Sequence, residues 1–267
     1  MPFRKAWLWV LVLFALTFVA FWPGYFSKLP DSELAHHYHA ASAVLWMILA
    51  IGQSWTVHHN QLALHRMTGL AVFLLFPFFL IAGVWVIHVE ATTLAGDLTS
   101  IEGKIIAQIG FFDLLANIAF GLLFWMGLKY RYRVQLHARY MLATLLLVIS
   151  PLGFRLLAMA VPFLGADENF SYAMAGGNVM ALVVALYLYL QAPKNGRPFL
   201  IAAGFIVAQE VTFETLGRVP AWAPMFASVS DVNLPFLLLL TGIASAGIAW
   251  HGWLAGARRG IPKALAA

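Results

Sequence analysis

Long apolar stretches separated by short polar connections follow one another along the whole chain. Most of them reach the roughly 20 residues that an α-helix needs to cross the ~30 Å hydrocarbon core of a bilayer. The pattern therefore predicts an all-α integral membrane protein, a bundle of about eight transmembrane helices in one polytopic domain covering residues 1–267. The expected segments are about 6–22, 36–57, 67–88, 105–128, 140–163, 173–191, 199–217 and 234–255.

Composition agrees with this assignment. Hydrophobic residues make up 62% of the chain and charged residues 10%, whereas soluble domains carry about 25% charged residues. The chain has no cysteine, which excludes disulfides, iron–sulfur clusters and thiolate zinc sites. The first segment follows Arg4 and Lys5 and has no small-residue cleavage site, so we expect a retained helix and not a removed signal peptide.

The charges between the segments are distributed unequally between the two sides of the predicted bundle, and in the outside connections the acidic residues outnumber the basic residues Lys28, Lys104 and Arg218. With the N-terminus inside, the inside connections carry only basic residues, and this asymmetry follows the positive-inside rule. It predicts a multi-pass protein of the bacterial inner (cytoplasmic) membrane with both termini cytoplasmic. Because topology accounts for the basic residues, they indicate no nucleic-acid partner. The basic set is Arg66, Lys129, Arg131, Arg133, Arg139, Lys194, Arg197, Arg258, Arg259 and Lys263, and the acidic set outside is Asp31, Glu33, Glu90, Asp97, Glu102, Asp167, Glu168 and Asp231.

Two connections resemble each other in sequence. The stretch "LALHRMTGLA" begins at Leu62 and "VQLHARYMLA" begins at Val134, and each places Leu-His just before an apolar run. Helices two–three and four–five are therefore a possible parallel repeat of one hairpin. The alternative is independent use of His and Arg at helix starts. His65 and His137 occupy equivalent positions in either case, at the inner membrane surface.

Ionisable residues inside the apolar segments need an explanation, since charges in the hydrocarbon are costly and usually functional. Asp113 lies in the fourth segment with Asn117 one turn further on, and Arg155 follows Pro151 in the fifth. The proline is expected to kink its helix and to leave carbonyls near Arg155. One interpretation is a proton-handling group, and the other is a structural Asp113–Arg155 pair that joins two helices.

With the N-terminus inside, Asp113 and Arg155 lie in the outer half of the membrane, and further polar residues lie there too. Glu210 and Glu214 form one face of the seventh segment with Arg218, and His36, His39 and His88 lie at outer helix ends. Gln53 shares a helix face with His39, fourteen residues before it. The outer layer predicted from these positions is His36, His37, His39, His88, Asp113, Arg155, Glu210 and Glu214.

The run His39, Gln53, "HRMTG" (His65 to Gly69) and "HARYM" (His137 to Met141) resembles an uncharacterised bacterial family of polytopic membrane proteins. Its pattern is His…Gln…HRxxG followed by HxRxM, over about Ala35 to Arg155. The resemblance implies the topology and the choice of residues, and it brings no activity. Ala138 departs from the basic residue more usual there. A weaker likeness, to b561-type haem membrane proteins, rests on paired membrane histidines.

These residues are consistent with three functions. The first is a redox or haem-binding protein in which His39, His65 and His137 bind haem b or a transition metal, Arg155 offsets a propionate, and quinone or other membrane subunits are partners. The second is a proton-coupled transporter that uses Asp113, Glu210, Glu214 and Arg155, with Gln53 and Asn117 as further polar relay positions. The third is a metal-dependent membrane enzyme with His and carboxylate ligands, for which His36, His39 and His88 are the candidates.

Overall fold

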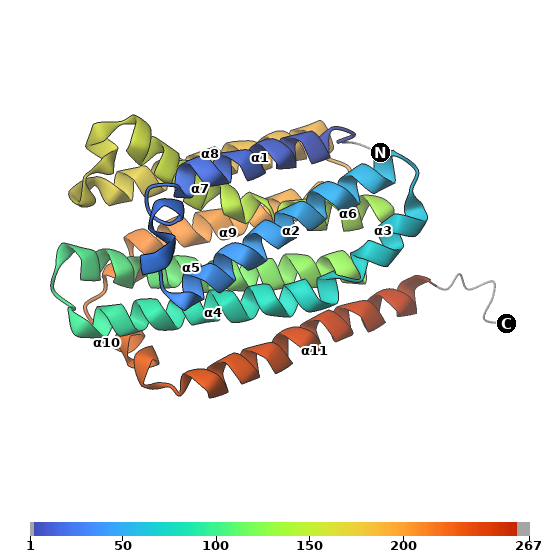
Figure 1. The fold of residues 1–267 in the computed structure, drawn as a ribbon. Helices are drawn as coiled ribbons and strands as arrows, with labels where there is room; N and C mark the ends of the chain where they lie inside the picture. Colours follow the sequence, from blue (N-terminus) through green and yellow to red (C-terminus); the bar gives the residue numbers. More distant parts are fainter. Residues whose placement is uncertain (1–2, 261–267) are drawn as a thin grey trace.

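The computed structural model describes residues 3–260, with side chains up to Gly256, and it is entirely helical apart from turns and short connections. Its long helices run side by side along one axis (Figure 1). They are α1 (Ala6–Phe21), α2 (Leu34–His58), α4 (Val72–Gly96), α5 (Ile101–Lys129), α7 (Leu146–Ala160), α8 (Phe170–Gln191), α9 (Arg197–Glu214) and α11 (Leu234–Gly260). The short α-helices are α3 (Leu62–Gly69), α6 (Val134–Ala143) and α10 (Trp222–Ala227), and the 3₁₀ turns are η1 (Phe26–Asp31), η2 (Pro162–Gly165), η3 (Asp167–Asn169), η4 (Leu216–Arg218) and η5 (Ser228–Asp231).

The structure confirms a multi-pass membrane bundle. Seven helical segments in the described residues are long and apolar enough to cross a membrane, with α6 and α7 counted together as one. The first predicted segment, α1, has 16 residues and is about 24 Å long at 1.5 Å per residue, shorter than a bilayer core. The start of α1 and the end of α11 nevertheless lie at the same end of the bundle (Figure 1).

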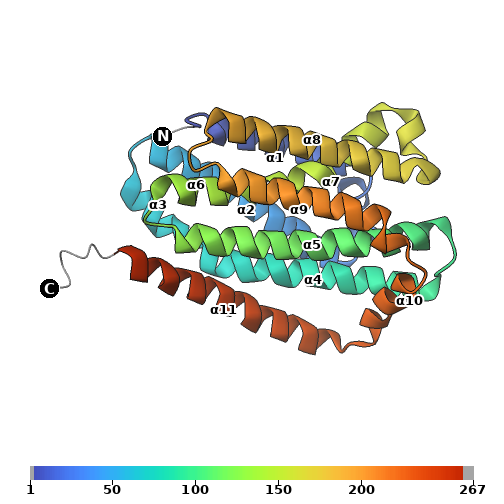
Figure 2. The same cartoon turned by 180° about the vertical axis from the view of Figure 1, so that it is seen from behind.

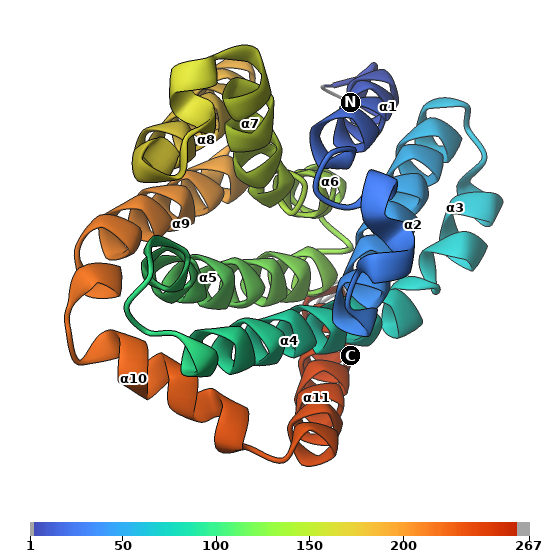
Figure 3. The same cartoon turned by 60° about the vertical axis from the view of Figure 1, so that its left-hand side comes forward.

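We name the two ends of the bundle by their charge. The basic end carries the α2–α3, α5–α6 and α8–α9 connections, and the acidic end carries the α1–α2, α4–α5 and α7–α8 connections. At the acidic end α10 crosses from α9 to α11 (Figure 3). Trp222 anchors it, because its indole Nε1 donates to the Ala107 carbonyl at 2.7 Å and its ring stacks on Phe111 at 3.8 Å.

Seven helices of the described chain form a closed ring in the order α1, α2, α4, α5, α9, α8 and α7, and α11 packs outside the ring against α4 and α5 (Figure 2). The seam between α4 and α5 is filled by stacked phenylalanines. Phe76 lies 3.9 Å from Phe124, and Phe79 lies 4.1 Å from Phe120. Within a bilayer such close packing, more than removal from water, holds helices together.

The two echoing segments have a common local structure. Each LHxx motif lies on a short helix, α3 or α6, which ends in a two-residue break before the long helix begins. Pro77 and Pro151 each occupy the sixth position of the following helix. The surroundings differ, however, because α2 packs along α4 whereas α5 and α7 barely touch. The likeness is thus one of helix shape, and the arrangement of the two hairpins is not repeated.

Helix boundaries shift relative to the expected segments where these breaks occur. The third segment was expected over 67–88, but α4 begins at Val72 and continues to Gly96. Its extension draws Glu90 from the predicted outer connection into the helix. The physical reason is that Ile87, Ala91 and Leu94 continue the packed apolar face past the acid, while Asp97 ends the helix in an extended conformation.

The glycine pair of α8 is a helix-packing site, as its small size predicts. A Cβ atom on Gly177 would lie 2.5 Å from the Ser150 carbonyl oxygen and 2.7 Å from the Phe154 nitrogen, both backbone atoms of α7. A Cβ atom on Gly176 would meet Leu157 at 2.5 Å. The backbones of α7 and α8 therefore approach closely, which brings their polar side chains into contact.

Candidate functional site

Two carboxyl groups meet inside the bundle near its acidic end. Glu90 of α4 and Asp113 of α5 share a side-chain hydrogen bond. Glu90 Oε2 is buried and receives no hydrogen bond from an N–H or O–H group of the described residues. Since two carboxylates only accept, their contact requires a proton on one of them.

Arg155 of α7 supplies a positive charge to this carboxyl pair without touching it. Its guanidinium lies within electrostatic range of both acids, yet the described residues contain no ion pair closer than 4.0 Å apart from that of Glu214 with Arg218. Arg155 Nη1 instead donates to the Pro151 carbonyl at 2.8 Å. Its flat face lies 4.2 Å from the Phe21 ring centre, so the arginine is held in place by α1 and by its own helix. The direct Asp113–Arg155 pair considered from the sequence does not form.

Histidines of α2 complete the group. His36 and His39 lie within electrostatic range of Arg155. The His39 ring packs on Phe79 at 5.5 Å, and its Nδ1 is buried with no hydrogen-bond partner among the described residues. A buried imidazole nitrogen without a partner is unusual and is available to give or accept a proton.

Asn117 lies one turn from Asp113 and extends the polar group along α5. Its Nδ2 donates to the Asp113 carbonyl at 2.9 Å, while its Oδ1 is buried without a partner in the described chain. A Cβ atom on Gly83 of α4 would meet the Asn117 amide, so the two helices make close contact here. We call His36, His39, Glu90, Asp113, Asn117 and Arg155 the acidic-end cluster.

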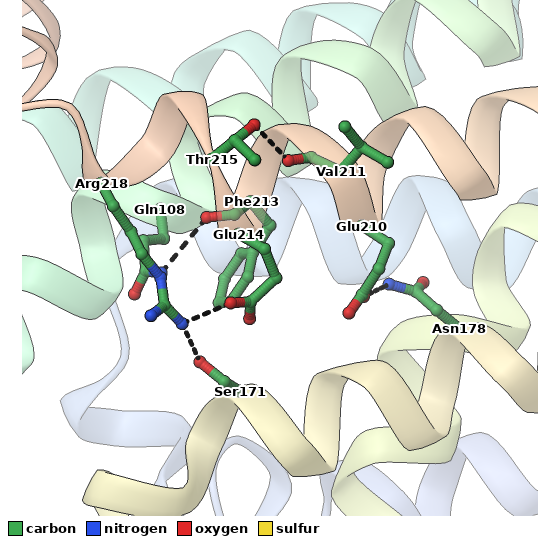
Figure 4. Close-up of polar contacts among 9 residues, drawn as sticks. All are labelled: Gln108, Ser171, Asn178, Glu210, Val211, Phe213, Glu214, Thr215 and Arg218. Atoms are coloured by element: carbon green, nitrogen blue, oxygen red, sulfur yellow. Dashed lines mark hydrogen bonds and ion pairs between the residues drawn. The ribbon is translucent and has the colours of Figure 1, made fainter.

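The remaining acids of the predicted outer layer belong to a separate group on α7, α8 and α9. Ser150 donates to Asn178 Oδ1, and Asn178 Nδ2 donates to Glu210 Oε2 at 2.6 Å. Glu214 pairs with Arg218 at 2.5 Å, and Arg218 also donates to Ser171 at 2.9 Å (Figure 4). The predicted single layer is therefore two groups, the acidic-end cluster and this α8–α9 group.

At the basic end, Gln53 joins α2 to α3. Both atoms of its amide are satisfied when the nitrogen donates to His65 Nδ1 (2.7 Å) and the oxygen accepts from Thr68 Oγ1 (2.7 Å) and the Gly69 nitrogen (3.2 Å). A Cβ atom on Gly69 would lie 3.2 Å from the Gln53 oxygen. These contacts give the Gln…HRxxG pattern a structural role, because its His, Thr and Gly all surround the glutamine.

His65 and His137 lie beside each other, with ring centres 6.5 Å apart and planes at 85°. His137 Nδ1 donates to the Gly127 carbonyl at 2.9 Å, which leaves its Nε2 with the lone pair in the neutral ring. His65 Nδ1 accepts from Gln53, so its hydrogen is on Nε2. Burial lowers the pKa of His65, and this outweighs the opposing effect of the Gln53 backbone carbonyl.

These tautomers suit proton sharing better than haem ligation. An axial ligand binds iron through a lone pair while its other nitrogen donates to the protein. His137 meets this condition. In its neutral form His65 does not, because Gln53 donates to the nitrogen that would need to donate. The pair thus offers one donor and one acceptor, as in a proton relay.

The other histidines serve local contacts. His88 contacts the Val232 carbonyl at 3.1 Å, and His37 contacts the Tyr25 hydroxyl at 2.8 Å. His59 stacks on Trp55 at 4.4 Å. Among the described residues no three His, Asp or Glu side chains are grouped so that they could hold a metal ion, so the set His36, His39 and His88 is not assembled as a metal centre.

Sequence reasoning placed Asp113, Arg155, His36 and His39 in one layer, and the structure brings them together. It missed Glu90, which was assigned to a connection. Glu90 lies seven residues after Gly83 and so shares the face of α4 that contacts Asn117, a face that only the packed structure identifies.

Comparison with known protein families, curated proteins and solved structures finds no match for this chain. Of the properties that the family resemblance implies, the structure supports a polytopic, all-helical membrane protein.

Proposed function

We propose that this protein is a proton-coupled carrier of the bacterial cytoplasmic membrane and that Glu90 and Asp113 bind the coupling proton. The observation that carries the proposal is the hydrogen bond between the two carboxyl groups on adjacent helices. Intramembrane acids that face a bundle interior are typical of proton relays. The resemblance to an uncharacterised family adds no activity, so the proposal rests on these contacts.

Proton loss changes the forces between α4 and α5. With one proton the pair is held by a hydrogen bond, and without it two negative charges repel in a medium of low dielectric constant. Arg155 reduces the cost of the deprotonated state but cannot cancel it from its position on α7. The close Gly83–Asn117 contact makes this seam sensitive to any separation. Deprotonation therefore favours a different packing of the two helices, which is what coupling requires.

The phenylalanine seam separates the acidic-end cluster from the basic end. Phe79 and Phe120 stack directly below Asn117 along α4 and α5, and the buried Trp46 indole closes the seam from α2. The His65–His137 pair lies beyond it. A proton thus has a station at each end and an apolar barrier between them, as expected of alternating access.

Infrared difference spectroscopy of the protein in lipid nanodiscs, titrated with acid and base, tests the proton site. The native chain should show the carbonyl band of a protonated carboxylic acid, and this band should shift or disappear in Glu90→Gln and in Asp113→Asn. Glu102→Gln is the matched control, because Glu102 is an exposed acid in the first turn of α5 at the same end. Bands unchanged in both cluster variants would overturn the proposal.

Binding of haem or a metal, with a redox function, is the second candidate. It is favoured by one observation, the His137 hydrogen bond to Gly127, which is the bond that ligating histidines usually make. An absorption spectrum of the purified protein, oxidised and reduced, compared with that of His137→Ala, decides between this candidate and the first. The metal-dependent enzyme proposed from His and carboxylate residues has no corresponding contact in the described chain.

A further inference from the structure

A groove between α8 and α9 combines apolar walls with one carboxylate. Its volume is about 240 Å³. The walls are Ala175, Val179, Leu182, Val207 and Val211, and the polar lining residues are Asn178 and Glu210. Val179, Val207 and Val211 are exposed on the outer face of the bundle, so the groove opens toward the lipid. Glu210 is the one charged residue among those that line it.

Hydrogen bonds from buried residues fix the position of the Glu210 side chain. Ser150 and Asn178 are fully buried. The Ser150 hydroxyl donates to Asn178 Oδ1 and thereby directs the amide Nδ2 at Glu210, where the bond is 2.6 Å long. An amide N–H directed at a carboxyl oxygen stabilises the carboxylate form. The series of donors ends on Glu210, which can only accept.

Glu210 has no cationic partner in the described part of the chain. The nearest arginine along the chain, Arg218 of η4, is bonded to Glu214 and Ser171 (Figure 4). A carboxylate in an apolar setting without a counter-ion is costly. The groove beside Glu210 is open to a ligand that brings a positive charge.

We propose that this groove binds an organic cation with a small apolar body, such as an aromatic or short-chain ammonium compound, whose charge pairs with Glu210. The volume fits one aromatic ring or a short alkyl group beside the carboxylate, and the apolar walls suit a ligand that arrives from the membrane. A neutral lipid chain would leave Glu210 uncompensated, so charge complementarity selects the cation. The inference rests on the proposed function only in making this cation the cargo of the carrier.

Binding of benzyltrimethylammonium to the full chain in nanodiscs, measured by calorimetry, tests the site. Its neutral isostere neopentylbenzene has the same shape without the charge. The native protein should bind the cation and not the isostere. Glu210→Gln should weaken cation binding by at least about tenfold, the loss expected for one hydrogen bond or contact to a charged group. Glu214→Gln, four residues away on the same helix face, should bind as the native chain does, because Glu214 is paired with Arg218.

A second variant keeps the test decisive if Glu210→Gln does not fold. Val207→Phe fills the groove and leaves every charge in place, so it should also weaken binding. Equal binding of the cation and the isostere, or native affinity in both variants, would overturn the site. Asp113→Asn separates the two proposals: it should lose the carboxylic-acid band and still bind the cation. If the native protein shows the carboxylic-acid band but does not bind the cation, the cation site is refuted and the proton site is not.

Discussion

At the scale of single residues, the environment of His65 predicts a pH-dependent stability. Burial lowers its folded-state pKa below that of the unfolded chain, so the unfolded state binds more protons as the pH falls. The stabilising contribution is therefore complete above the unfolded pKa of about 6.5 and is lost as the pH falls below it. The melting temperature in detergent should drop between about pH 7 and pH 5, and His65→Gln should drop less steeply.

The control for this prediction is His59→Gln. His59 lies at the same end of the bundle but is exposed, and its substitution should leave the native slope of melting temperature against pH. An identical slope in the native protein and in His65→Gln would show that burial does not keep the His65 ring neutral.

The candidate site could be predicted from the sequence only as far as residue depth allows. Asp113 and Arg155 were found because a charge inside an apolar run needs a reason. Glu90 was missed because its helix end depends on packing against α5 and α10, which periodicity does not show. The sequence also could not predict that the outer layer divides into two groups, because this depends on how each helix is rotated about its own axis. The echo predicted only that His65 and His137 lie at one depth, and it did not predict that their ring centres lie 6.5 Å apart.

At the scale of helices, the α7–α8 contact predicts an intolerant glycine. A Cβ at Gly177 would strike backbone atoms of α7, which cannot move aside as a side chain would. Gly177→Ala should destabilise the protein by about 1–3 kcal/mol, the cost of overpacking, and should weaken the Ser150–Asn178 contact. Gly204→Ala in α9, where the added Cβ meets nothing within 4 Å, should be neutral or stabilising. Thermal unfolding of both in detergent checks this, and equal midpoints would contradict it.

Helix existence followed from the apolar pattern, while the breaks at α3–α4 and α6–α7 did not. Each break is only two residues long and is followed by an apolar run, so the apolar pattern alone predicts one continuous helix. Poor helix formers, Gly69 before the first break and Thr144 within the second, weaken the helix there, and hydrogen bonds between helices hold the breaks in place. Thr144 accepts from the Trp46 indole at 3.0 Å, and Thr68 contacts Gln53 at 2.7 Å. Such contacts exist only after the chain has folded.

At the scale of the whole molecule, the charge asymmetry predicts how the bundle lies in the membrane. The basic end should face the cytoplasm. Because the chain lacks cysteine, single cysteines can report this without background. A membrane-impermeant maleimide applied to spheroplasts should label Leu98→Cys at the acidic end, and should label Tyr132→Cys at the basic end only after lysis. Both residues are exposed in the structure, by 41% and 62%.

Lys5→Cys, just before α1, tests whether this 16-residue helix crosses the bilayer as well. In the ring, α1 runs from the basic to the acidic end and packs on α2 and α7. A helix of about 24 Å can do so where the bilayer thins locally to match it. Lys5→Cys should then behave like Tyr132→Cys and react only after lysis. Labelling from outside would leave seven crossings with the two ends of the chain on opposite sides, and it would remove α1 and its Phe21 contact from the support of Arg155.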